Sequence, residues 1–245
     1  MGRAIVAGGN PKMKAPVTGI LAQDIAVGST VKLMEGGAAV EYLVVNQGIP
    51  SNSNLYDASC DGTWLLRKDI HNITRVWDIA DVNKYEISTT NTWLNGGYFS
   101  SLGTVEQATI KQVKIPYRKN GGSGGTDESG ANGLSAKIFL LSGYEVGWTT
   151  SDSGYFPVDG AKLAYFESGT GTSASNKRIA NLNGLATAWW FRSPYIKDTN
   201  SAWLATDTGG CNSIIVSIEN GIRPALILPS NAVFDETSLL LKGVA

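Results

Sequence analysis

The sequence predicts a single α+β domain of mixed type, dominated by β-strands and containing a few short helices and long loops. Glycine accounts for 29 of the 245 residues, and only 17% of the residues are charged, against roughly 25% in an average soluble domain. The apolar runs have the length of strands and lie between turn-forming residues. This length is ample for one buried core, and the composition argues against long helical bundles.

Residues 1–24 are expected to form an extended arm, and residues 25–245 the folded domain. The arm is dense in glycine and proline and has no acidic residue before Asp24, so it is not expected to fold independently. It could be a disordered tail or a docking strand for a larger assembly. The apolar run before Gly8 is too short for a signal peptide, and no stretch approaches the roughly 20 residues that span a bilayer. We therefore expect no membrane insertion.

The first third of the domain is expected to be β-structure. Residues 27–33 and 40–46 are rich in β-branched and aromatic residues, and Glu35-Gly36-Gly37 between them is typical of a hairpin turn. Residues 63–68 form a third expected strand.

Helical spacing appears next. Trp93, Leu94 and Phe99 predict a helix within residues 89–99. Thr104 and Gln107 fit a capping box that opens a second helix toward residue 111. Residues 112–118 alternate between polar and apolar, and Pro116 favours an edge strand there.

The only low-complexity tract is Asn120-Gly-Gly-Ser-Gly-Gly-Thr-Asp-Glu-Ser-Gly130. Its composition resembles that of a flexible linker. Because a strand is expected again at residues 136–141, we interpret residues 119–133 as a flexible surface loop within one domain. Residues 142–147 and 158–166 favour short helices.

The last third is again expected to be β-structure. Its predicted strands are residues 186–191, 202–206, 214–218 and 222–228. No period of 20 to 50 residues repeats, so the sequence does not favour a solenoid or a propeller.

Several chemistries are disfavoured by composition. One histidine, His71, and two cysteines, Cys60 and Cys211, cannot form a multi-histidine or four-cysteine zinc site. A disulfide between the cysteines is possible but nothing demands it, and His71 is expected in a turn or on the surface. The net charge of −1 gives no field that would recruit nucleic acid. We expect no cofactor and no bound metal.

Two motifs stand out, Ala188-Trp-Trp-Phe-Arg-Ser-Pro194 and Gly221-Ile-Arg-Pro-Ala-Leu-Ile-Leu228. Adjacent tryptophans on a strand point to opposite faces, and a buried guanidinium can hold several backbone carbonyls. We therefore favour a scaffold role over a ligand anchor. The scaffold residues are Trp189, Trp190, Arg192, Ser193, Pro194, Gly221, Arg223 and Pro224.

With Trp93-Leu94-Asn95, Lys137-Ile-Phe-Leu-Leu-Ser142 and Glu145-Val146-Gly147, these motifs resemble a bacterial and bacteriophage domain family marked by Trp-Trp-x-Arg-Ser-Pro and Gly-Val-Arg-Pro-Ala-Leu, often called a domain of unknown function. Ile222 and Phe191 depart from its usual Val and Leu. The resemblance runs from about Asp24 to Leu241. It implies a C-type-lectin-like fold, similar to formylglycine-generating enzymes and to the variable proteins diversified by retroelements. Chains with such an arm resemble phage virion proteins.

In the lectin-like variable proteins, the stretch between the two motifs displays binding residues, and the resemblance carries this role to residues 195–220. Aromatic side chains supply contact area, and asparagines supply adaptable hydrogen bonds. The alternative is a solvated hairpin with Trp203 in the core. The candidate contact residues are Tyr195, Ile196, Lys197, Asp198, Thr199, Asn200, Trp203, Asp207 and Asn212.

The resemblance thus predicts a non-enzymatic protein on the surface of the phage particle that binds a host cell-surface protein or glycan. The arm would contact other virion proteins, and a homo-oligomer, a trimer by analogy with phage fibres, is expected. One rival is a purely architectural capsid-decoration or tail-assembly protein. The other is a polysaccharide hydrolase using Asp57 with Asp61 or Asp152 with Asp159, since glycosidases need paired carboxylates. A calcium site on Asp152, Asp207 and nearby carbonyls is conceivable, but the sequence contains no EF-hand spacing that would support it.

Overall fold

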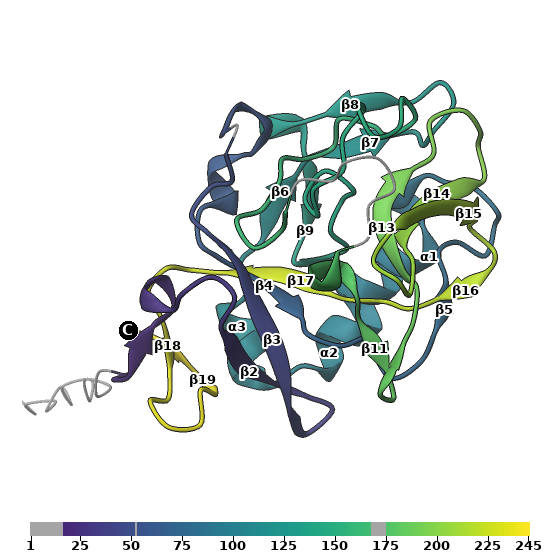
Figure 1. Cartoon of the computed structure of the whole chain (residues 1–245). Helices are drawn as coiled ribbons and strands as arrows, with labels where there is room; N and C mark the ends of the chain where they lie inside the picture. The colour runs from purple at the N-terminus through teal and green to yellow at the C-terminus, as the bar shows by residue number, and fades with distance from the viewer. Residues whose placement is uncertain (1–16, 52, 168–174) are drawn as a thin grey trace, which may run out of the picture.

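The computed structural model describes residues 17–51, 53–167 and 175–245. A five-stranded antiparallel sheet crosses the middle of the molecule (Figure 1). In spatial order its strands are β10 (Ile138–Phe139), β17 (Ala225–Leu228), β4 (Thr63–Arg67), β3 (Ala38–Gln47) and β2 (Thr30–Glu35). The hairpin between β2 and β3 was predicted correctly, and its turn places Gly36 and Gly37 at positive φ (59° and 84°), which glycine adopts without steric cost.

Both faces of this sheet are buried. Successive residues of a strand point to opposite faces, so Leu65 and Leu226 enter one hydrophobic cluster, while Trp64, Leu66 and Ile227 enter the other. This explains why β4 and β17 read as continuous apolar runs rather than as alternating patterns.

A second antiparallel sheet holds the tryptophan motif. It consists of β13 (Trp189–Pro194), β14 (Ser201–Ala205) and β15 (Cys211–Ile215). As expected, the adjacent tryptophans separate: Trp190 lies in the first cluster and Trp189 in the second. The strand predicted at residues 214–218 was misplaced, because the chain turns after Ile215 and pairs again only at β16 (Glu219–Asn220).

A third sheet joins the end of the expected arm to the end of the chain. Its order is β1 (Ile20–Leu21), β18 (Ala232–Phe234) and β19 (Leu241–Val244). Ala22, in the 3-10 turn η1 (Ala22–Asp24), is fully buried. Residues 20–24 are therefore integrated into the domain, while residues 1–16 of the expected arm lie outside the described residues.

The helices are short and lie where they were predicted, within residues 89–99 and from residue 104 toward residue 111, although the second ends at Thr109. They are α1 (Thr89–Trp93), the π-helical turn η5 (Leu94–Tyr98), α2 (Phe99–Ser101) and α3 (Thr104–Thr109). The capping box was wrong: Gly103 is the N-cap of α3. The Gln107 side-chain amide instead donates to the Leu102 carbonyl (2.7 Å).

Four short ladders complete the fold. They are β5 (Arg75–Val76) with β16, β6 (Val113–Ile115) with β9 (Leu134–Ala136), β7 (Tyr117–Lys119) with β8 (Thr126–Glu128), and β11 (Asn181–Leu182) with β12 (Leu185–Ala186). The remaining 3-10 turns are η2 (Ser53–Leu55), η3 (Ala58–Cys60), η4 (Tyr85–Ile87), η6 (Gly130–Asn132) and η7 (Asn176–Arg178). Pro116 divides the strand predicted at residues 112–118 into β6 and β7.

The helices predicted at residues 142–147 and 158–166 were wrong. The first segment is a single turn, in which Ser142 N–H donates to Glu145 Oε2 (2.9 Å) and Glu145 N–H donates to Ser142 Oγ (3.1 Å). Gly147 follows at φ 103°, a left-handed value that ends the turn. The segment 158–166 is irregular up to residue 163 and then makes one turn.

The broad fold class is confirmed: the molecule is a β-rich mixed α+β structure with few, short helices. Within the described ranges, no helix has the length and apolar character needed to cross a membrane.

Candidate functional site

The frame of the candidate site is strand β13, and Arg192 is its centre. The Arg192 and Glu145 side chains are both 0% exposed. A guanidinium has five N–H donors, and here all five are used. Nε donates to Pro116 O (2.9 Å), Nη1 to Leu140 O (2.9 Å) and Glu145 Oε2 (2.6 Å), and Nη2 to Glu145 Oε1 (2.6 Å) and Asp159 O (2.6 Å). The arginine therefore joins strand β13 to three other segments.

Ser193 extends this network to a second carboxyl group. Its hydroxyl donates to Asp159 Oδ2 (2.7 Å) and accepts from Gly143 N–H (2.9 Å). Asp159 Oδ1 is buried and has no hydrogen-bond partner among the residues that the structure describes. Burial raises the pKa of Asp159 to about 7, and the neighbouring Arg192 opposes this rise only in part.

In the second motif, residues 221–228, Arg223 holds the end of strand β4 in the five-stranded sheet. Arg223 donates from Nε to Arg67 O (3.1 Å) and from Nη2 to Lys68 O (2.9 Å), and it lies 4.6 Å from the ring centroid of Trp189. Burial lowers the pKa of Arg223 to about 10. A Cβ on Gly221 would lie 2.8 Å from the Ala188 carbonyl oxygen, so the close approach of β13 requires glycine there.

All eight predicted scaffold residues are buried, which is the placement a scaffold role requires. They are Trp189, Trp190, Arg192, Ser193, Pro194, Gly221, Arg223 and Pro224.

The stretch 195–220 is not uniformly exposed. Lys197, Thr199, Asp207 and Asn212 are exposed, whereas Tyr195, Ile196, Asp198 and Asn200 are half-buried. Trp203 is only 6% exposed, so its expected place on the contact surface was wrong. Its ring stacks on Phe156 at a centroid distance of 3.9 Å, and its Nε1 donates to Tyr155 O (3.2 Å). Both faces of β14 are covered by other parts of the protein, so neither set of alternating side chains on this strand points into solvent.

The connection between β13 and β14, residues 195–200, is named the display turn below. Asp198 fixes its shape, because Asp198 Oδ1 accepts from Asn200 N–H (3.1 Å) and Ser201 N–H (2.8 Å). A carboxylate used in this way caps a turn, so Asp198 is a structural residue rather than a free contact residue.

Asn83, which the sequence did not suggest, holds the display turn through hydrogen bonds of its side chain. Its side-chain amide donates to Tyr195 O (3.3 Å) within the turn and to Ser201 O (2.8 Å) directly after it, and its Oδ1 accepts from Gly122 N–H (2.9 Å). Asn83 is 1% exposed. No motif surrounds it, so no sequence signal could have identified it.

The glycine-rich tract lies against the same turn. Ser123 N–H donates to Asp198 O (2.7 Å), and a Cβ on Gly122 would lie 2.0 Å from Tyr195 O. The start of the predicted flexible loop 119–133 is therefore packed and requires glycine for close approach, and its later part forms β8. Its mobility stays a prediction.

The display turn and the neighbouring Tyr155 together present aromatic and cationic groups. Lys197 Nζ lies 5.1 Å from the ring centroid of Tyr155, and the Tyr155 and Tyr195 centroids are 5.1 Å apart. Tyr155 is 38% exposed. We take Tyr155, Tyr195, Lys197 and Thr199 as the candidate contact surface.

The carboxylates considered for hydrolysis have local structural roles. Asp57 Oδ1 accepts from Ser59 N–H (2.9 Å) at the start of η3, and Asp152 Oδ2 accepts from Thr149 N–H (2.8 Å). Asp159 is sealed in the core, and Asp61 is exposed. Across residues 17–51, 53–167 and 175–245, no three His, Cys, Asp or Glu side chains are placed to hold a metal ion.

The structure also places the two cysteines and His71. Cys60 and Cys211 are both free thiols, and burial raises the pKa of Cys60 to about 12 and that of Cys211 to about 11. His71 is half-buried rather than at the surface, packs edge-on against Trp93 and Tyr98, and lies 3.8 Å from Glu35.

Residues 61–230 match the model of one protein family, Domain of unknown function (DUF6273). The chain belongs to this family. The DUF6273 region covers both motifs, the display turn and Asn83, and it leaves the β2–β3 hairpin and the β18–β19 pair outside. No curated protein and no solved structure matches the chain.

Proposed function

We propose that this protein is a non-enzymatic phage virion protein whose domain, of C-type-lectin-like type, binds a host cell-surface protein or glycan through the display turn. The resemblance of the two motifs to phage-borne display domains motivates the proposal. In its favour is the way the display turn is held: Asn83 and Asp198 fix its backbone, and Lys197 and Thr199 remain exposed. The Arg192 network holds strand β13, which leads into the turn.

This separation matters because a binding surface is most useful when its side chains can vary without unfolding the support. The backbone contacts of the display turn use carbonyl and N–H groups, which every residue except proline supplies. Tyrosine adds contact area with little loss of side-chain entropy. In the proposed assembly, the N-terminal arm attaches the protein to other virion proteins, and the particle holds it as a homo-oligomer.

The test uses the isolated chain in a binding assay on host cells. The double variant Lys197→Glu/Thr199→Glu should lower binding at least about tenfold, since a lost contact of roughly 1.4 kcal/mol has that effect. Its melting temperature should stay unchanged. The matched control is Lys242→Glu/Thr237→Glu, which makes the same chemical changes at two exposed residues near the C-terminal strands.

Unchanged binding by the display-turn variant would overturn the proposal. The architectural alternative makes a different prediction, because it places residues 195–200 between neighbouring subunits. Hydrogen exchange at these amides would then slow on assembly of the particle, and the isolated chain would not bind host cells.

A further inference from the structure

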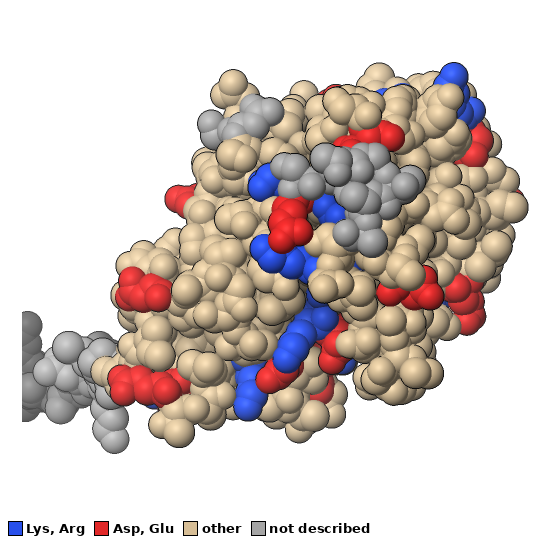
Figure 2. Space-filling model, in the orientation of Figure 1, with Lys and Arg blue, Asp and Glu red and all other residues tan. Residues whose placement is uncertain are grey.

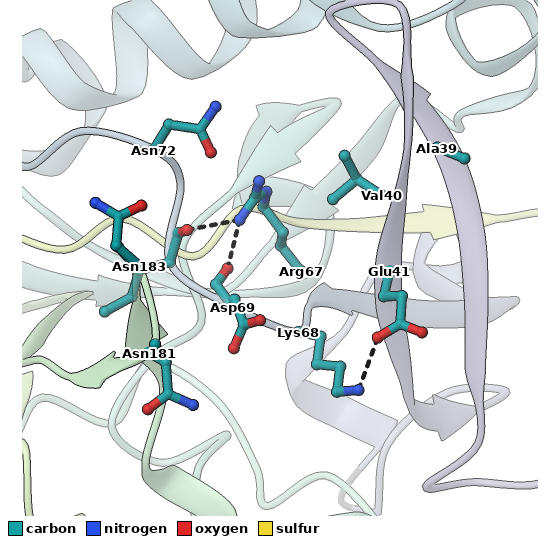
Figure 3. A pocket seen from close by; sticks show the side chains of 11 residues that line it. Ala39, Val40, Glu41, Arg67, Lys68, Asp69, Asn72, Asn181 and Asn183 are labelled. Carbon is teal, nitrogen blue, oxygen red and sulfur yellow. Dashed lines mark hydrogen bonds and ion pairs between the residues drawn. The ribbon is translucent and has the colours of Figure 1, made fainter.

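A polar hollow of about 340 Å³ lies on another part of the molecule. One wall is strand β3 near Glu41, the other is the β11–β12 hairpin, and the floor is the segment from Arg67 to Ile70 (Figure 3). Small-molecule sites usually occupy roughly 300–1,000 Å³, so the hollow has room for a ligand of one or two sugar rings.

The floor is bonded to both walls through the backbone. Lys68 N–H donates to Glu41 O (3.0 Å), and Ile70 N–H donates to Asn181 O (2.9 Å). Arg223 holds the same segment from beneath through the carbonyls of Arg67 and Lys68. The hollow is therefore built on three mutually bonded segments, and a ligand would meet a site that is already formed.

The Arg67 guanidinium lies at the floor and is fixed in place. Nε donates to Glu35 Oε2 (3.0 Å), and Nη1 donates to Asp69 O (2.8 Å) and Ile70 O (2.6 Å). Nη2 donates to none of the described residues, although the Arg67 side chain is only 6% exposed. A buried ion pair contributes little net stability. Here the Arg67–Glu35 pair instead fixes the position of the Arg67 guanidinium, which has unused N–H groups, at the bottom of the hollow.

Three asparagine side chains also line the hollow, all on one side of this guanidinium in Figure 3. They belong to Asn72, Asn181 and Asn183, and their amide groups make no hydrogen bond with any residue in the described part of the chain. The carboxylate of Asp69 is likewise unused. Each carboxamide offers two donors and one acceptor oxygen, which suits hydroxyl groups, since each hydroxyl both donates and accepts.

The charges of the lining balance. Arg67 and Lys68 are offset by Glu41 and Asp69, and Lys68 Nζ already pairs with Glu41 Oε2 (2.7 Å). Basic and acidic side chains are also interleaved along a diagonal line across the face in Figure 2. A phosphate or sulfate group needs a surplus of positive charge, so the lining favours an uncharged ligand. Val40, which is half-buried, adds an apolar contact that a sugar ring can use.

We propose that this hollow binds a neutral saccharide, with its hydroxyl groups on Arg67 Nη2, the Asp69 carboxylate and the three asparagine amides. The site is separate from the display turn and goes beyond the function proposed above. Its test does not depend on whether the display turn binds a host molecule.

The experiment is a nuclear magnetic resonance titration of the full ¹⁵N-labelled chain. The probes are glucose, galactose, N-acetylglucosamine, mannose and their β-linked disaccharides. At least one of them should shift the side-chain amide signals of Asn72, Asn181 and Asn183, with a dissociation constant on the order of 1 mM. The double variant Asn72→Ala/Asn181→Ala should weaken this binding at least tenfold.

Asn132→Ala is the matched control, because Asn132 is an exposed asparagine in η6, outside the hollow; it should leave the affinity unchanged. The display-turn variant Lys197→Glu/Thr199→Glu should leave it unchanged as well, which separates the two proposals. The saccharide site is overturned if no probe shifts the three amide signals at about 50 mM. It is also overturned if glycerol binds as tightly as every sugar, or if inorganic phosphate binds and the sugars do not.

Discussion

Two buried arginine–glutamate pairs support this fold, and they differ in how completely the hydrogen bonds of the guanidinium are formed. Around Arg192 and Glu145, both side chains are 0% exposed and every guanidinium donor is used. Around Arg67 and Glu35, both side chains are 6% exposed, and one nitrogen of the guanidinium has no described partner.

The supporting residues differ too. Glu145 Oε1 accepts from Tyr56 OH (3.1 Å), and Glu145 Oε2 accepts from Ser142 N–H (2.9 Å). Glu35 Oε2 accepts from both the Tyr42 hydroxyl (3.0 Å) and the Tyr98 hydroxyl (2.7 Å). The comparison indicates that a completed network is structural, whereas an incomplete one at the base of a hollow can also serve a ligand.

The largest effect is expected from Arg192→Met. The substitution leaves the Glu145 carboxylate buried without its cation, which should cost about 3–5 kcal/mol of unfolding free energy. Equilibrium urea denaturation measures this loss. The double variant Arg192→Met/Glu145→Leu removes both charges and should recover most of it. A single variant that loses less than about 1 kcal/mol would contradict the structural role of the completed network.

The next-largest effect is expected in the pH dependence of the unfolding free energy. Because the pKa of Asp159 is raised to about 7 in the folded protein, the folded state holds a proton that the unfolded state releases near pH 4. The unfolding free energy should therefore fall as pH rises from about 4 to about 7, by roughly 3–4 kcal/mol from this group.

Asp159→Asn removes the ionisation, so the variant should lack this decline. Other groups titrate in the same window, including His71, whose pKa burial lowers; the readout is therefore the difference between the pH profiles of wild type and variant. Parallel profiles would show that Asp159 is not buried as the structure has it.

A smaller loss is expected from Arg67→Met, about 2 kcal/mol, because Glu35 keeps the Tyr42 and Tyr98 hydroxyls as donors and a lost charged hydrogen bond costs roughly 1.5–3 kcal/mol. Urea denaturation beside Arg192→Met measures the difference. If both substitutions cost the same, the contrast between the two networks would fail.

The sequence predicted those parts of the molecule whose signals are local. The Gly36-Gly37 turn and the opposite orientations of Trp189 and Trp190 follow from turn chemistry and strand geometry. The burial of Trp203 was foreseen only as the alternative to a contact role, because its stacking partner Phe156 is distant in the sequence and belongs to no recognisable element.

The hollow could be predicted only in part. Asn183-Gly184 is a strong hairpin signal, and it forms the turn between β11 and β12 with φ values of 53° and 83°. The pairing of Glu35 with Arg67 has no such signal. Glu35 ends β2 and Arg67 ends β4, with β3 between them, so the two charges meet only when the register of the whole sheet is known.

The smallest effect tests the hairpin wall of the hollow. A Cβ on Gly184 would meet nothing within 4 Å, but Gly184 lies at φ 83°, so Gly184→Ala should cost about 1 kcal/mol through backbone strain alone. Gly154→Ala is the control, since a Cβ there also meets nothing and its φ is not positive; its stability should match or slightly exceed that of wild type. If the wall positions Asn181 and Asn183, Gly184→Ala should also weaken saccharide binding, whereas Gly154→Ala should not. Equal melting temperatures for the two variants would show that the β11–β12 turn does not have the left-handed geometry on which this wall depends.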